Sequence, residues 1–106
     1  MPQFAVYRNK YLQGSGFYPL LVDVQSELLA ELGTTVVIPL AKAGSRCTQF
    51  PLLQLMPTIE IEGERYTAVT TRLAGISRSD LGPHISSAAA QQHVLLSALD
   101  LMLRGF

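Results

Sequence analysis

This 106-residue sequence contains one cysteine, Cys47, and no tryptophan. A single cysteine excludes an internal disulfide and a cysteine-based metal cluster. Charge is also scarce: charged residues make up 15% of the chain, and 8 basic residues balance 8 acidic ones. The resulting formal net charge of zero provides no broad positive field that would attract nucleic acid.

Long apolar runs are missing too, so we expect no segment that spans a membrane. The start, Met1-Pro2-Gln3-Phe4, lacks the basic and apolar regions of a secretory signal. We therefore expect a cytoplasmic protein in which residues 1–106 form one domain. Hydrophobic residues reach 48%, and so much apolar character with so little charge predicts an interaction surface.

Motifs that carry chemistry are absent from the sequence. It has no phosphate-binding loop, dinucleotide fingerprint or nucleophile elbow, and the spacing of His84 and His93 matches no metal motif. Asp23 lies between two valines of an expected strand, where turn hydrogen bonds and a structural role are the better interpretation. We therefore expect no catalytic residue, no metal, no cofactor and no small-molecule substrate.

The chain reads as short strands followed by one helix. The β-branched run Thr34–Ile38 is the clearest strand signal. The strands expected in all cover residues 3–7, 18–24, 34–38, 58–61, 65–71 and the neighbourhood of 75–79, with loops at 9–16 and 41–54 and a helical turn at 27–31. Strands segregated from a terminal helix predict an α+β fold in which the helix covers an antiparallel sheet.

The expected helix, residues 94–103, carries two adjacent apolar stripes, and Ser86 or Ser87 is the expected cap. A face this wide indicates either a deep core position or two partners, such as the sheet and a second subunit. Both alternatives stay open. Gly105 is suited to ending the helix, and Phe106 after it should be buried against its own domain or a partner.

Two segments give the sequence a family resemblance. The block Leu21-Val22-Asp23-Val24-Gln25-Ser26-Glu27-Leu28-Leu29 and the later Val37-Ile38-Pro39-Leu40-Ala41 strongly resemble the CcdB family of toxins from toxin–antitoxin modules. The opening Gln3-Phe4-Ala5-Val6-Tyr7, the pair Thr70-Thr71 and the ending Leu101-Met102 with Gly105 follow in the family's order. The resemblance covers essentially the whole chain.

The resemblance implies a compact antiparallel sheet, an SH3-like barrel of the CcdB/MazF type, with a long C-terminal helix. It further implies a homodimer that binds the A subunit of DNA gyrase and traps the cleaved DNA complex. The toxin is then an inhibitor and not an enzyme. A CcdA-like antitoxin neutralises it, and operator DNA is contacted only through the antitoxin complex.

The resemblance implies two sets of site residues, one carried across by position for gyrase and one in the loops at 9–16 and 41–54, where we expect the antitoxin to bind. The gyrase-binding set is Leu28, Leu29, Asp100, Leu103, Arg104, Gly105 and Phe106, and the antitoxin-binding set is Asn9, Lys10, Tyr11, Ala43 and Arg46. The best-known family member has tryptophan where this chain has Arg104 and isoleucine where it has Phe106. Core packing of the two leucines and ordinary helix capping by Gly105 are the structural alternatives.

Two other functions remain as alternatives. One is a MazF-like ribonuclease that cleaves messenger RNA, for which Arg65, Thr70, Thr71 and Arg72 form the available cluster. The other is a chromosomal homologue that folds and has lost its toxicity, an interpretation to which Arg104 lends weight.

Overall fold

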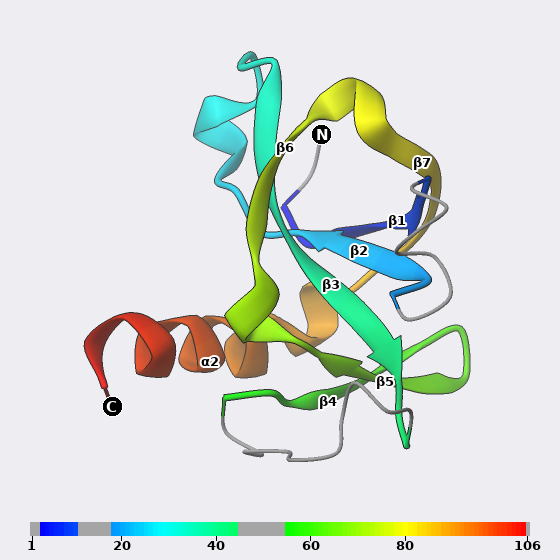
Figure 1. Cartoon of the computed structure of the whole chain (residues 1–106), viewed down its shortest axis with the longest axis vertical. Coiled ribbons are helices and arrows are strands. Elements are labelled where there is room, and N and C mark those ends of the chain that lie inside the picture. The colour runs from blue at the N-terminus through cyan, green and yellow to red at the C-terminus, as the bar shows by residue number, and fades with distance from the viewer. Residues whose placement is uncertain (1–2, 11–17, 45–54, 106) are drawn as a thin grey trace.

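The computed structural model describes residues 3–10, 18–44 and 55–105. A curled antiparallel sheet and one C-terminal helix dominate it (Figure 1). The strands are β1 (Ala5–Asn9), β2 (Leu20–Asp23), β3 (Thr34–Lys42), β4 (Thr58–Ile61), β5 (Glu64–Ala68), β6 (Ala74–Ser77) and β7 (Leu81–Ser87). Helix α2 covers Gln92–Arg104, and single 3₁₀ turns occupy Glu27–Leu29 (η1), Thr70–Arg72 (η3), Arg78–Asp80 (η4) and Ala89–Gln91 (η5). The α+β prediction is confirmed.

Strand β3 is central, and it changes partner along one edge. The strands follow the order β4-β5-β3-β2-β1-β7, and β6 also pairs with β3. On that edge β6 pairs with residues 34–37 and β5 with residues 40–42. Pro39 sits at the change, and its carbonyl accepts from Val69 N on the same side. In a β-strand the N–H and C=O of one residue point to the same side. The side of Pro39 that lacks an N–H therefore faces the gap between β6 and β5, and no hydrogen bond to β2 is lost.

The core lies inside the curl of the sheet. Leu20, Val22 and Val24 share the inner face of the sheet, and all three belong to the buried cluster. Helix α2 contributes the fully buried Leu95 to this cluster and packs the partly buried Val94 and Leu99 against it.

Two loop expectations need correction. Asn9 belongs to β1, where its N–H donates to the Pro19 carbonyl. Ala41 is a buried residue of β3, which continues to Lys42 because β5 pairs with it there. In both places a neighbouring strand supplies the order that the local sequence does not indicate.

Strand β7 was not expected, and the expected cap of the helix is wrong. Gly82 and Pro83 make this stretch look like loop, yet it pairs with β1 along irregular register. A Cβ on Gly82 would lie 2.5 Å from the Arg8 carbonyl oxygen, so only glycine allows this approach. Ser87 Oγ accepts from Ala89 N at the η5 turn, whereas α2 begins after Gln91 without a side-chain cap.

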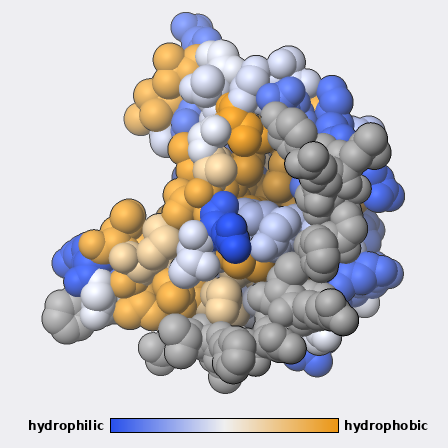
Figure 2. Space-filling view, viewed as in Figure 1, coloured by the Kyte–Doolittle hydropathy of each residue, from blue (hydrophilic) through white to orange (hydrophobic). Residues whose placement is uncertain are grey.

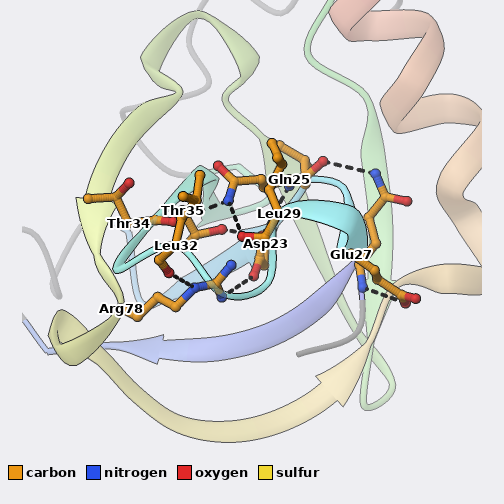
Figure 3. A network of polar contacts seen from close by, with 10 residues as sticks. Asp23, Gln25, Glu27, Leu29, Leu32, Thr34, Thr35 and Arg78 are labelled. Carbon is orange, nitrogen blue, oxygen red and sulfur yellow. Dashed lines mark hydrogen bonds and ion pairs between the residues drawn. The ribbon is translucent and has the colours of Figure 1, made fainter.

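Asp23 has the expected structural role. It is 2% exposed, and its Oδ1 accepts from Thr35 Oγ1 at 2.7 Å and from Gln25 N at 3.0 Å. Its Oδ2 lies 3.6 Å from Nη1 of Arg78, a partner that the sequence did not indicate. Figure 3 shows these side chains converging between β2, β3 and η4.

We predict that Arg78→Met lowers the free energy of unfolding by about 3 kcal/mol, because it leaves a buried carboxylate without its countercharge. Urea denaturation measures the effect. The matched control is Arg65→Met, at an exposed position of β5, with an expected change within about 0.5 kcal/mol. Equal effects of the two substitutions would contradict the importance of the buried pair.

Candidate functional site

The η1 turn presents leucines to solvent. Leu28 is 94% exposed and Leu29 is 46% exposed. Ser26 starts the turn, since its Oγ accepts from Leu28 N at 3.2 Å. Core packing is therefore the wrong explanation for Leu28, which leaves apolar surface open to solvent together with the exposed Leu29 and Leu32.

The end of α2 is a second exposed apolar position. Leu103 is 74% exposed. Gly105 adopts a left-handed φ of 82°, and its N–H donates to Leu101 O at 2.8 Å, so the expected helix end is confirmed. Arg104 and Asp100 form an exposed i,i+4 pair at 3.4 Å, a weak contact that a partner can replace. Phe106 lies outside the described residues.

The wide apolar face of α2 is only partly covered. Leu95 and Ala98 are its buried residues, whereas Leu96 remains 46% exposed beside the exposed Leu103. The deep-core alternative is therefore wrong. Figure 2 shows apolar surface along this helix, and the uncovered part is available to a partner.

The two exposed positions lie on the same side of the protein, but they are well separated. Figures 1 and 2 place η1 and the end of α2 at opposite ends of a hollow, with β6 running between them. One protomer therefore does not bring Leu28 and Leu29 together with Leu103. A groove of about 200 Å³ also opens on this part of the sheet, and its lining includes Leu21, Val37, Pro39, Arg72, Ala74 and Ile76.

The described antitoxin candidates do not form one cluster, and Asn9 is among the residues that line this groove. Asn9 Nδ2 donates to Tyr18 O, and Lys10 Nζ donates to Ser79 O. Ala43 follows β3, and its N–H donates to Arg65 O. Tyr11 and Arg46 lie outside the described residues.

A pocket of about 370 Å³ opens beside these positions, lined in part by Arg8, Lys42, Glu62, Glu64 and Tyr66. Burial raises the pKa of Tyr66, and the nearby Glu64 carboxylate raises it further. The phenol therefore stays protonated and donates to Glu64 Oε2 at 3.3 Å. Lys42 Nζ lies 4.0 Å from the same oxygen. The pocket thus offers both signs of charge next to apolar walls.

The residues considered for ribonuclease chemistry do not converge. Thr70 is fully buried, and its hydroxyl donates to Ala68 O at 3.5 Å. Arg72 belongs to η3 after β5, whereas Arg65 lies near the opposite end of that strand, across from Glu60. The strand therefore separates the two guanidinium groups.

The histidines have no shared role. His84 makes an edge-on contact with Tyr7, with ring centroids 5.5 Å apart, and His93 is exposed on α2. Within residues 3–10, 18–44 and 55–105, no three His, Cys, Asp or Glu side chains are placed to hold a metal ion. In the same ranges no helix is long and apolar enough to cross a membrane.

The comparison with protein families gives a match over nearly the whole chain. The family model described as CcdB protein matches residues 3–105. This range includes η1, α2 and the pocket beside Asn9, and it ends on the helix-terminating Gly105.

We predict that Gly105→Arg leaves the fold intact and costs about 1 kcal/mol, the penalty of a left-handed backbone for a residue with a Cβ. A Cβ at this position meets no atom within 4 Å. Thermal unfolding followed by circular dichroism measures the cost. An unfolded variant would show that the helix end is packed in the core.

Proposed function

Because this chain belongs to the CcdB family, whose members are the toxins of toxin–antitoxin systems, we propose that it inhibits DNA gyrase. In this proposal it binds the A subunit and traps the complex that contains cleaved DNA. It acts by binding alone and forms no covalent bond with its target. The exposure of Leu28 and Leu103, both outside the core, is the observation that supports the proposal most.

The proposed gyrase-binding surface is Leu28, Leu29, Asp100, Leu103, Arg104, Gly105 and Phe106. The leucines supply apolar area. Arg104 stands where the best-known family member has tryptophan, and its planar guanidinium can stack on a flat partner surface as an aromatic ring does. Within the described residues its side chain is held by the exposed pair with Asp100, so little is lost when it turns to a partner.

A homodimer is part of the same proposal, and the sheet edges support it. The outer edge of β4 is blocked, because the Gln91 side chain accepts from Glu60 N and donates to Glu60 O, both at 2.8 Å. Pro83 and the irregular register interrupt β7. Strand β6, with exposed Ala74 and Gly75, pairs only with β3 among the described residues. An open edge of small residues invites pairing with another strand.

A two-fold axis that passes between two paired β6 strands would also place the second copy in the hollow between η1 and α2. An isologous contact uses the same patch on both copies, so each copy would cover the other's exposed helix face around Leu96. The two helix ends would then belong to one composite surface for the target.

The antitoxin is proposed to bind through Asn9, Lys10, Tyr11, Ala43 and Arg46, with the pocket that Arg8, Lys42 and Tyr66 line as part of its binding area. Mixed charge and apolar walls suit a disordered segment that folds on binding. Operator DNA is then contacted through the antitoxin complex, in agreement with the zero net charge of this chain.

We expect Leu103→Asp and deletion of Phe106 each to weaken binding to purified gyrase A subunit by about 2 kcal/mol or more, the loss typical of a buried anchor. Isothermal titration calorimetry measures it. Ser97→Asp is the matched control, since it adds the same charge to an exposed position of the same helix. If both test variants bind gyrase A subunit with wild-type affinity, the gyrase-binding site lies elsewhere on the protein.

Dimerisation predicts a melting temperature that rises with protein concentration. Ala74→Glu on β6 should shift sedimentation to the monomer, because it places charge at the paired edge. Ala90→Glu, at an exposed position of η5, is the control and should remain dimeric. A wild-type monomer at micromolar concentration would contradict the dimer, and a dimeric Ala74→Glu would contradict this interface.

A further inference from the structure

The segment between β2 and β3 has almost no packing of its own. Residues 25–34 include no buried residue, although Leu28, Leu29 and Leu32 all belong to it. Apolar burial therefore does not fix where these leucines lie. Polar contacts must do so, because a surface segment with few buried contacts otherwise opens easily.

Hydrogen bonds inside the segment only shape its turns. Leu29 N donates to Ser26 O and Ala30 N donates to Glu27 O, both at 3.0 Å, while Leu32 N donates to Leu29 O at 3.1 Å. Each bond joins residues three apart in the chain. They leave the orientation of the whole segment on the sheet undetermined.

Two long-range contacts reach the segment from outside it: Gln3 N–H donates to Glu27 Oε1 at 3.1 Å, and Arg78 makes the other. Its Nε donates to Leu32 O at 2.8 Å, and its backbone N–H donates to Gly33 O at 2.9 Å. Its Nη1 lies 3.6 Å from the Asp23 carboxylate, and its side chain is only 17% exposed. One guanidinium therefore links the end of the exposed segment to a buried anion of β2.

Gln25 makes the second connection from the same anchor. Its N–H donates to Asp23 Oδ1 at 3.0 Å, and its Nε2 donates to Leu29 O at 3.4 Å and Thr34 O at 3.1 Å. Figure 3 shows Gln25 and Arg78 reaching the segment from either side of Asp23.

We propose that Arg78 is a positioning residue for the exposed leucines: it ties the Leu32 carbonyl to buried Asp23 and so presents Leu28 and Leu29 to the partner. This inference rests on the proposed function, which places those leucines at the gyrase contact. A preset orientation raises affinity because the segment need not be ordered during binding.

Arg78→Lys separates this role from simple stability. Lysine keeps a cation near Asp23, but it has a methylene where arginine has Nε, so the donor to Leu32 O is lost. Arg65→Lys, at an exposed position of β5, makes the same chemical change away from the segment and serves as the control.

We expect Arg78→Lys to melt within about 5 °C of wild type, while the amides of Ala30 and Leu32 exchange hydrogen about tenfold faster. Its dissociation constant for purified gyrase A subunit should rise about tenfold. Arg65→Lys should change neither quantity. Unchanged exchange in Arg78→Lys would overturn the proposal, as would faster exchange with unchanged gyrase affinity.

Gln25→Met covers the case in which Arg78→Lys fails to fold. It removes the donors to Leu29 O and Thr34 O and leaves the charged pair in place, and the same two effects are expected. If wild-type protein does not bind gyrase A subunit at all, the proposed function fails. Hydrogen exchange in the two variants then decides alone whether this tether orders the segment.

Discussion

The buried carboxylate of Asp23 is the constraint on which this structure depends. A charge withdrawn from water is stable only when it is paired and hydrogen bonded, and Asp23 satisfies this need with Thr35, Gln25 and Arg78. Those three residues come from β3, from the turn after β2 and from η4. The contacts of this one carboxylate therefore fix how the central strands β2 and β3 lie relative to the η4 turn, which leads from β6 to β7.

The same network explains how apolar side chains remain exposed in a stable position. Leu28 contributes nothing to the core, and its turn contains no buried residue. Polar contacts hold the turn instead, through Asp23 and through the hydrogen bond from Gln3 N to Glu27 Oε1, and they leave its leucines available for a partner. At the other end of the hollow, Leu103 is presented by a helix that Leu95 and Ala98 anchor. A toxin that acts by binding needs such surfaces, and the core does not require them.

Local pattern predicted much of the fold. The strands expected at residues 3–7, 18–24, 58–61 and 65–71 correspond to β1, β2, β4 and β5, and the position of Asp23 between two valines correctly indicated a structural group. Strand β7 could not be predicted, because Gly82 and Pro83 look like loop until β1 lies beside them. Arg78 was missed because a lone arginine far along the chain carries no sign of its buried partner. The candidate site residues were identified from the family resemblance. Their exposure could not be predicted from the sequence, since adjacent leucines such as Leu28 and Leu29 usually belong to the core.

The central claim is that this CcdB-family protein poisons gyrase, and a DNA cleavage assay tests it most directly. Purified gyrase is incubated with supercoiled plasmid, ATP and the protein, and the reaction is stopped with detergent and protease before electrophoresis. The account predicts that linear plasmid accumulates as the protein concentration rises, because the cleaved complex is trapped. Uninterrupted supercoiling with no linear DNA at saturating protein would contradict it.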